Sequence, residues 1–450
     1  IALSRKLDDK MLILLKQGKS FFHIGASGHE AAQLAAAEVI KPGEDWSFPY
    51  YRDGAYCIGL GMTAREQLLS FLAKAADPNS GGRQMPQHYG HKDLRIVSQS
   101  SPTGTQFLQA VGCAMVCKIR KTKEVVYVSA GEGTTSQGDF HEALNWASNA
   151  KAPVIFHIQD NEYAISTHRS EQTASSIYDM TSGYGNLSRY DVDGTDFFET
   201  SLAFKEAVQR ARRNKGPSII VSHVVRLLPH SSSDDQRKYR DEKALNNDLK
   251  KDPLLILESK CIDTKFIKAD EFAKIRLQVD KDVDNDSAWA ENQDFPEPGT
   301  AMDHIYSSNE YPEESTFNPI AEKIVIVDAI NHALHEEMEL NEKMVVYGQD
   351  IADPKGGVFT ATKGLSDKFG NGRVFNSPLA ESSIVGTAVG MAVSGYKPVV
   401  EIQFGDYIWT AMMQIRNEVA TMRYRSNNSW ACPMVIRVPV GGYIHGALCH

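Results

Sequence analysis

The sequence predicts an α/β fold with two doubly wound parallel-sheet domains joined by an acidic linker. Short β-branched runs alternate with helical patterns from residue 105 to 225, and the same alternation restarts beyond residue 320. Residues 281–320 between them hold ten acids, one base and four prolines, without apolar periodicity. Strands alternating with helices of this length form parallel sheets through right-handed crossovers. We therefore expect domains at 1–280 and 321–450, with 281–320 as the linker.

The first domain is predicted to hold three central strands. We expect strands at 125–130, 154–159 and 218–225, with helices at 105–120, 139–149 and 197–213. Residues 226–275 are charged and helical in pattern, without clear strands. The carboxyl ends of such strands meet at one edge of a sheet, and ligands of doubly wound folds bind at that edge.

The second domain is predicted from the same alternation. We expect helices at 322–340, 383–394 and 407–423, with strands at 344–348, 397–403 and 432–438. The sequence stops at His450 in a glycine-rich loop, where a further strand is expected. We therefore expect this domain to be incomplete and a C-terminal domain to be absent.

The composition excludes several classes of protein. With 42% apolar and 23% charged residues, the chain is not a disordered protein. The net charge of −9 lies entirely in residues 281–320, because the remainder has 47 acids and 47 bases. This balance argues against a nucleic-acid partner, and no apolar run approaches the roughly 18 residues of a membrane span. Six cysteines without a CxxC pair indicate buried thiols in a reducing compartment.

Two polar motifs follow neighbouring predicted strands. Glu132 lies between Gly131 and Gly133 after the first strand, and Asn161 follows the next strand. Carboxylate and amide oxygens suit Mg²⁺ or Ca²⁺, and backbone amides beside glycine can approach a phosphate at a helix N-terminus. The alternative is a simple strand-to-helix turn. A nicotinamide dinucleotide fingerprint is absent, because Ser136 stands where its third glycine is required.

Four further stretches have polar or titratable groups in suggestive positions. Arg226 and His230 precede a polar loop and together suit a diphosphate, although a solvated loop is the alternative. Tyr51 and Arg52, and the tract 82–90 with His88, are either site residues or surface loops. Glu381 precedes a helix, where an acid is favoured by the helix dipole without any function. The histidines of 441–450 face no evident metal partner.

Taken in order, these motifs resemble the thiamine-diphosphate-dependent decarboxylating component of 2-oxo acid dehydrogenase complexes. Residues 20–260 look like its α subunit, and 320–450 look like the first domain of its β subunit, so the chain resembles a fused αβ form. The Gly-Glu-Gly motif followed thirty residues later by Asn161 in NEYAIST is similar to the cofactor fingerprint of that family. The tract 82–90, GRQMPQHYG, resembles the branched-chain member rather than the pyruvate member.

The resemblance implies a set of site residues. It implies Mg²⁺ ligands at Glu132, Asn161 and the carbonyl of Tyr163. It implies contacts to the diphosphate half of thiamine diphosphate at Tyr51, Arg52, Ser101, Gly133, Thr134, Arg226 and His230. It implies contacts to the aminopyrimidine end of the same cofactor at Leu379, Glu381, Gln403 and Tyr407. It also implies a potassium site at Ser100, Pro102, Thr105 and Gln106. The sequence departs from the family at Gln159, where an arginine is common, and at Ser382, where a glutamine is common.

The resemblance also implies an activity, oxidative decarboxylation of a 2-oxo acid. Glu381 would share a proton with the aminopyrimidine, His230 and His450 would donate protons during acyl transfer, and His88 would line the substrate pocket. The substrate would be branched, like 2-oxoisovalerate, and the acyl group would pass to the lipoyl group of a partner acyltransferase. The alternatives are a pyruvate or acetoin dehydrogenase component and a transketolase-type enzyme. A homodimer is expected, in the bacterial cytoplasm or in the mitochondrial matrix of a eukaryote.

Overall fold

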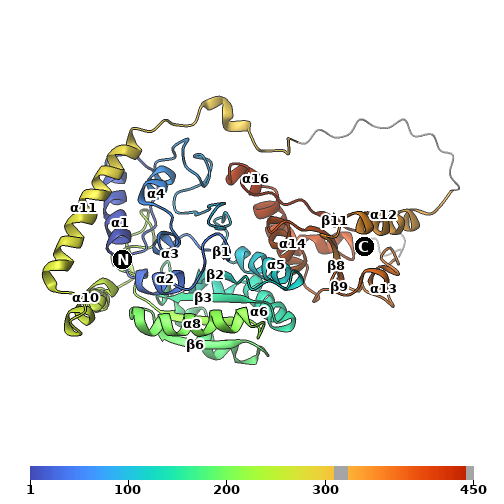
Figure 1. The fold of residues 1–450 in the computed structure, drawn as a ribbon, viewed down its shortest axis with the longest axis horizontal. Helices are drawn as coiled ribbons and strands as arrows, with labels where there is room; N and C mark the ends of the chain where they lie inside the picture. The colour runs from blue at the N-terminus through green and yellow to red at the C-terminus, as the bar shows by residue number, and fades with distance from the viewer. Residues whose placement is uncertain (309–322, 442–450) are drawn as a thin grey trace.

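The computed structural model describes residues 1–308 and 323–441. His450 and the other histidine of the C-terminal loop therefore lie outside the described residues. The chain forms two parallel-sheet domains, the first coloured blue to yellow and the second orange to red (Figure 1). The predicted α/β class with two parallel sheets is confirmed.

The first domain is built on a five-stranded parallel sheet with the order β1-β2-β3-β7-β6. Its strands are β1 Trp46–Phe48, β2 Val126–Gly131, β3 Val154–Asp160, β6 Ser188–Asp193 and β7 Ser218–His223. The three predicted strands are β2, β3 and β7. The other two escaped prediction because β1 has three residues and β6 is a mostly polar edge strand. A two-stranded antiparallel ribbon, β4 Tyr163–Ala164 with β5 Thr167–His168, follows β3.

Helices cover both faces of this sheet, as expected for a doubly wound fold. Helices α5 and α6 pack on one face against Val128 and Phe156, and α2, α3 and α8 pack on the other against Tyr127 and Ile155. The helices of this domain are α1 Ala2–Lys16, α2 Glu30–Ala37, α3 Gly54–Gly59, α4 Ala64–Phe71, α5 Thr105–Ile119, α6 Gly138–Ala150, α7 Ile177–Met180, α8 Phe197–Arg212, α9 Glu242–Leu249, α10 Pro253–Asp263 and α11 Ala269–Glu291.

The second domain has a four-stranded parallel sheet with the order β11-β10-β8-β9. Its strands are β8 Met344–Gly348, β9 Val374–Asn376, β10 Lys397–Glu401 and β11 Val435–Arg437. Its helices are α12 Ile326–Leu340, α13 Leu365–Phe369, α14 Glu381–Val393, α15 Met412–Gln414 and α16 Met422–Arg425. Helices α12 and α13 pack on one face of the sheet, and α14 packs on the other.

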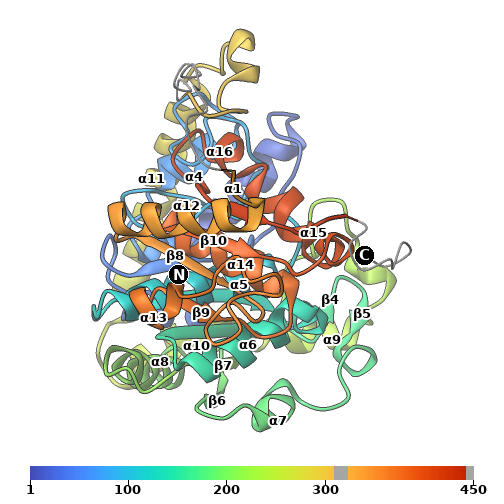
Figure 2. The same cartoon turned by 90° about the vertical axis from the view of Figure 1, so that its right-hand side faces the viewer.

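The two domains meet where α5 packs against α14, between the two sheets (Figures 1 and 2). Glycines allow the two helix backbones to touch. A Cβ on Gly112 would lie 1.9 Å from the carbonyl oxygen of Thr387, and a Cβ on Gly390 would lie 1.8 Å from that of Gln109. Buried apolar residues of both domains consequently form one continuous cluster.

The predicted acidic linker is wrong over its first eleven residues, because α11 continues to Glu291. Val283 and Ala290 are buried against α1, and Lys10 of α1 pairs with Asp284 across 2.5 Å. Figure 1 shows α11 as a long helix beside α1 at the far edge of the first domain. The many acids of this stretch obscured a stripe of small apolar residues. Residues 309–322 of the predicted linker lie outside the described residues.

The predicted helix at 407–423 is also corrected. The chain there forms a 3₁₀ helix over Gly405–Ala411, the short α15, a π-helical turn over Ile415–Val419, and α16. Each of these pieces is at most seven residues long, too short for apolar periodicity to distinguish one helix type from another. Because the helix is interrupted here, the side chains of Gln414 and Glu418 point toward the first domain, where both are fully buried.

No helix among the described residues is long and apolar enough to cross a bilayer. The cysteines at 57, 113, 117 and 261 are buried and unpaired, and Cys432 is unpaired and partly buried. Cys449 lies outside the described residues.

Candidate active site

A cavity of about 330 Å³ lies at the carboxyl ends of β2 and β3. It gathers residues from five separate stretches of the first domain, as the edge of a parallel sheet allows. The lining residues are Tyr50, Tyr51, Arg52, Ser101, Thr103, Gly131, Glu132, Gly133, Thr134, Asn161, Tyr163, Ala164, Ile165 and His230. The structure thus brings together the sequence-predicted metal ligands and nearly all residues predicted to bind the diphosphate half of the cofactor.

Glu132 begins a 3₁₀ helix directly after β2 and is only 2% exposed. Its Oε2 accepts a hydrogen bond from the Asn161 backbone N–H at 3.3 Å, while its Oε1 is buried and has no hydrogen-bond partner among the described residues. Burial, followed by repulsion from Asp160, raises the pKa of Glu132 to about 7. A partnerless buried carboxylate oxygen is costly, so this geometry fits a bound cation.

Asn161 supplies the second oxygen beside Glu132. Its Oδ1 accepts the Tyr163 backbone N–H at 3.2 Å and lies in the wall of the cavity. A carboxylate, an amide and a backbone carbonyl are hard oxygen ligands, which suit Mg²⁺. Within the described residues there is no cluster of three His, Cys, Asp or Glu side chains of the kind that binds transition metals.

Positive charge lies beside the cavity, because Arg52 lines it and Arg226 contacts the lining residue Ile165. Arg226 is 1% exposed, and its Nη2 donates to the Ile165 carbonyl at 3.0 Å and to the Tyr239 hydroxyl at 2.7 Å. Its Nε and Nη1 have no partner among the described residues, and burial lowers its pKa. Arg52 is also buried and donates to the carbonyls of Gly25 and His230. Two buried guanidinium groups, of which Arg226 has two spare nitrogens, fit an anion such as a diphosphate.

The second glycine of the Gly-Glu-Gly motif is required by close packing. A Cβ on Gly133 would lie 2.5 Å from the Cβ of Ala164 in the β4–β5 ribbon. At Gly131 the nearest atom would be 3.9 Å away, so that position has room for a side chain. The glycine at 133 therefore lets the ribbon close over the 3₁₀ helix that begins at Glu132.

Two predicted histidines flank the ring of Tyr51. The ring centroids lie 6.0 Å apart for His230 and 6.4 Å apart for His88. His88 Nδ1 donates to the Pro86 carbonyl at 3.0 Å, so its Nε2 accepts from the Ser101 hydroxyl at 2.7 Å. Burial lowers the pKa of both histidines, and burial together with Arg52 and Arg226 lowers that of His230 to about 4.

The predicted potassium ligands lie in the loop before α5 (Ser100, Pro102) and in the first turn of α5 (Thr105, Gln106), and this region contacts the second domain. The hydroxyls of Ser100 and Thr105 both donate to Glu418, the latter at 2.8 Å, and Glu418 also pairs with Arg425 at 2.6 Å. Gln106 instead donates to the carbonyl of Ser129, and the Pro102 carbonyl accepts from Thr105. Sequence reasoning missed Glu418, which lay inside an apparently regular helix.

The predicted aminopyrimidine residues lie outside the cavity. Glu381 starts α14, is half-buried, and accepts hydrogen bonds from Gln349 at 3.2 Å and Thr410 at 3.1 Å. Leu379 is 83% exposed, and Gln403 donates to Asp350. Within the described residues, none of the four predicted aminopyrimidine contacts, Leu379, Glu381, Gln403 and Tyr407, lines the cavity that holds Glu132.

The start of α14 nevertheless docks beside the Gly-Glu-Gly turn. Ser382 donates to Asp139 at 2.7 Å, and Ser383 donates to Glu142 at 2.7 Å, both in the first turns of α6. Gln414 also donates to Asp139, at 2.8 Å. The serine at 382, a departure from the family pattern, thus bonds across the domain interface.

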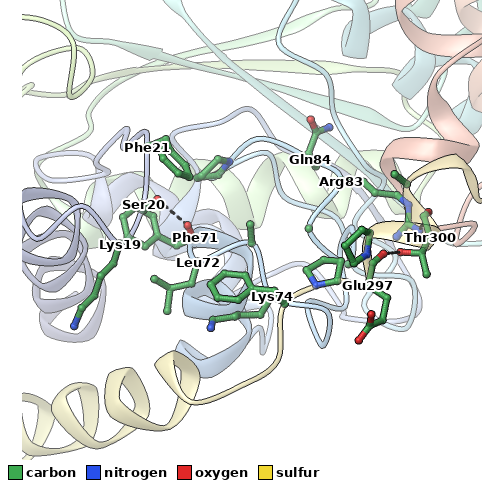
Figure 3. Close-up of a pocket in the computed structure, with 18 of the residues that line it drawn as sticks. Lys19, Ser20, Phe21, Phe71, Leu72, Lys74, Arg83, Gln84, Glu297 and Thr300 are labelled. Carbon is green, nitrogen blue, oxygen red and sulfur yellow. Dashed lines mark hydrogen bonds between the residues drawn. The ribbon is translucent and has the colours of Figure 1, made fainter.

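A larger cavity, of about 840 Å³, lies away from this chemistry (Figure 3). It is bounded by the chain around Lys19 and Lys74, the loop at Arg83 and Gln84, and the segment from Phe295 to Ala301. None of the predicted cofactor or metal residues lines it. A choice of cavity by volume alone would therefore have missed the predicted metal ligands and most of the predicted diphosphate contacts, which line the smaller cavity.

Comparison with known proteins identifies the family. The family model described as dehydrogenase E1 component matches residues 1–299. The chain belongs to this family. A second model, described as the transketolase pyrimidine-binding domain, matches residues 322–449. The first match extends past residue 280, in agreement with the course of α11.

Two relatives come from Bacillus subtilis (strain 168). The chain is 42% identical over 307 residues to 2-oxoisovalerate dehydrogenase subunit alpha, covering 68% of this chain and 92% of that subunit. It is 52% identical over 124 residues to the corresponding subunit beta, covering 28% of this chain and 38% of that subunit. The chain thus joins an alpha-like and a beta-like segment and spans well under half of the beta subunit.

A more distant relative has a different named substrate. The alpha subunit of the pyruvate dehydrogenase E1 component of Acholeplasma laidlawii is 32% identical over 279 residues, covering 62% of this chain and 77% of that subunit. The family and the pyrimidine-binding domain together indicate dependence on thiamine diphosphate.

Proposed function

We propose that this protein decarboxylates a branched 2-oxo acid with thiamine diphosphate and Mg²⁺. The observation that supports this most strongly is the pairing of unsatisfied groups around one cavity. Among the residues that the structure describes, Glu132 Oε1 has no donor and two Arg226 nitrogens have no acceptor. A bound Mg²⁺ diphosphate would satisfy both groups, since Glu132 would hold the cation and Arg226 would pair with the anion.

The residues of the first domain would bind and orient the cofactor. Glu132, Asn161 and the Tyr163 carbonyl would hold Mg²⁺, and Arg52, Arg226 and His230 would meet the diphosphate. Tyr51, Ser101, Gly133 and Thr134 would complete the pocket. The proposed potassium ligands Ser100, Pro102, Thr105 and Gln106 would fix the loop that carries Ser101, beside Glu418.

Thiamine diphosphate supplies a thiazolium ring that accepts the electrons released as carbon dioxide leaves. Glu381 would hold the proton exchanged with its aminopyrimidine nitrogen, and Leu379, Gln403 and Tyr407 would surround that ring. His88 would line the substrate pocket, and His230 and His450 would donate protons as the acyl group passes to a lipoyl group. A lipoyl-bearing acyltransferase is the partner we propose for that step.

We propose a homodimer in which a second copy supplies the aminopyrimidine residues. Two features support this arrangement. The four residues lie outside the cavity of their own chain. Leu379, which is one of the four, and Trp409, two residues after Tyr407, expose large apolar side chains, as expected for a surface that another subunit covers.

The substrate preference is supported by the relatives and by the sequence tract with His88. The B. subtilis alpha and beta relatives are both named for 2-oxoisovalerate. Pyruvate is the second candidate, favoured by the A. laidlawii relative. One methylene changes binding by only about 1–3 kcal/mol, so the preference is expected to be graded rather than absolute.

A substrate panel tests the proposed activity. The full chain with thiamine diphosphate and Mg²⁺ is assayed for reduction of an artificial electron acceptor by straight and branched 2-oxo acids. We expect turnover to be highest with 2-oxoisovalerate and to disappear in Glu381→Gln. Equal rates for wild type and Glu381→Gln would contradict the role of Glu381, and preference for pyruvate would contradict the substrate assignment.

A further inference from the structure

A chain of buried side chains lies beneath the metal side of the cavity. His29 is 0% exposed and precedes α2, and its Nδ1 lies 2.8 Å from Gln159 Oε1. Its other ring nitrogen, Nε2, lies 3.4 Å from the side-chain nitrogen of Asn161. Neither His29 nor Gln159 lines the cavity, and neither was expected from the sequence to bind cofactor or metal.

Backbone partners fix the orientation of the Gln33 amide, and the other groups of this network of side chains are then oriented in turn. Gln33 Oε1 accepts the Ala55 N–H at 3.1 Å, and its Nε2 donates to the Arg52 carbonyl, also at 3.1 Å. The same Gln33 Nε2 lies 2.9 Å from Gln159, so the atom that it meets there must be the acceptor, Oε1. An amide whose orientation follows from backbone partners is determined by the hydrogen-bond network.

The rest of the network follows from this starting point. Gln159 Nε2 donates to the Asp53 carboxylate at 2.5 Å, which agrees with the same amide orientation. Gln159 Oε1 then accepts from His29, so the hydrogen of the neutral ring is on Nδ1 and Nε2 is bare. A bare Nε2 accepts from the Asn161 amide nitrogen at 3.4 Å, so Asn161 Oδ1 points away from His29, where it also accepts the Tyr163 backbone N–H at 3.2 Å.

We infer that His29 is a positioning residue that turns the Asn161 side chain so that its oxygen, rather than its nitrogen, faces the metal. Gln159 acts one step further out by fixing the ring of His29. This inference rests on the proposed function, because it gives an outer partner to a proposed Mg²⁺ ligand. It also explains what Gln159 does in place of the arginine common in the family, since its amide can both accept from His29 and donate to Asp53.

The test measures metal binding through thermal stability in the full chain. Thiamine diphosphate is kept saturating while MgCl₂ is increased, and the Mg²⁺ concentration at half of the rise in Tm is recorded. His29→Leu removes the acceptor for Asn161 and keeps a side chain of similar size. Losing an outer-shell partner of a metal ligand weakens binding about 10- to 100-fold, so the midpoint is expected to rise by that factor.

A matched control removes a different buried polar group from the same region. The Tyr127 hydroxyl is fully buried and lies 3.3 Å from the Asp53 carboxylate, away from the path between His29 and Asn161. Tyr127→Phe is expected to lower Tm but to leave the Mg²⁺ midpoint unchanged. A midpoint that rises equally in Tyr127→Phe and His29→Leu would overturn the inference, because a general loss of packing would then explain both.

A second background separates orientation from packing. Asn161→Asp presents an oxygen to the metal in either rotamer, so the orientation set by His29 no longer matters. We expect His29→Leu to shift the midpoint far less in the Asn161→Asp protein than in the wild type. Equal shifts in both backgrounds would overturn the inference.

One variant covers the case in which His29→Leu does not fold. Gln159→Met removes the acceptor of the His29 N–H and is expected to raise the midpoint, whereas an unchanged midpoint would overturn the inference. Absence of any stabilisation of the wild type by thiamine diphosphate and Mg²⁺ would instead contradict the proposed function. The two failures are therefore distinguishable.

Discussion

The hydroxyl of Ser382 donates to the carboxylate of Asp139 across 2.7 Å, linking the first turn of α14 to the first turn of α6. Helix α6 follows the Gly-Glu-Gly turn, and α14 begins at Glu381. One hydrogen bond therefore connects the segment that carries the proposed metal ligand with the segment that carries the proposed proton-exchanging carboxylate. The packing of α5 on α14 holds these two segments together.

The α5–α14 contact predicts a large effect of a small change. Gly390→Ala would place a methyl group 1.8 Å from the Gln109 carbonyl oxygen, so the helices must separate. We expect the free energy of unfolding to fall by about 3 kcal/mol or more. Chemical denaturation measures this loss. Gly372→Ala, where the structure leaves open space, is the control and should change stability by less than about 0.5 kcal/mol.

The raised pKa of Glu132 predicts a pH dependence of stability without ligand. The carboxyl holds its proton up to about pH 7 when folded and to about its ordinary 4.5 when unfolded. Stability is therefore lost as pH rises from about 4.5 to 7, by an amount on the order of 3 kcal/mol. Glu132→Gln should lack this component in denaturation curves across that range. A wild type and variant with the same pH slope would contradict the prediction.

The lowered pKa of His230 predicts a response to anions. Burial and two arginines hold that pKa near 4, so the ring is neutral at pH 7. A bound diphosphate adds negative charge beside it and should raise the pKa by at least about one unit. NMR titration of the His230 ring proton, assigned by its loss in His230→Gln, measures both values. If the pKa of His230 does not change when inorganic pyrophosphate and Mg²⁺ are added, the anion does not bind beside this ring.

The packing of α11 predicts which of its residues stabilise the first domain. Val283 is fully buried against α1, so Val283→Ala is expected to cost about 2 kcal/mol. The Lys10–Asp284 pair is partly exposed, so Asp284→Asn is expected to cost less than about 1 kcal/mol. Denaturation of both variants tests the correction to the linker. Equal losses of stability in the two variants would contradict the prediction, because burial of Val283 would then contribute no more than the Lys10–Asp284 ion pair.

The sequence predicted the parts of the fold that have strong local patterns. Strands β2, β3 and β7 are buried β-branched runs, and polar residues after them meet at one sheet edge by a general rule. The acids of α11 hid its apolar stripe, and a three-residue strand such as β1 has no pattern to detect. Glu418 and His29 were missed because their roles depend on contacts with residues far away in the sequence.

The most direct test of the central claim is calorimetric titration of thiamine diphosphate into the full chain in the presence of Mg²⁺. We expect saturable binding at one site per chain, with binding lost on removal of Mg²⁺ and in Glu132→Ala. Binding that is unaffected by Glu132→Ala, or heat from NAD in place of thiamine diphosphate, would contradict this claim.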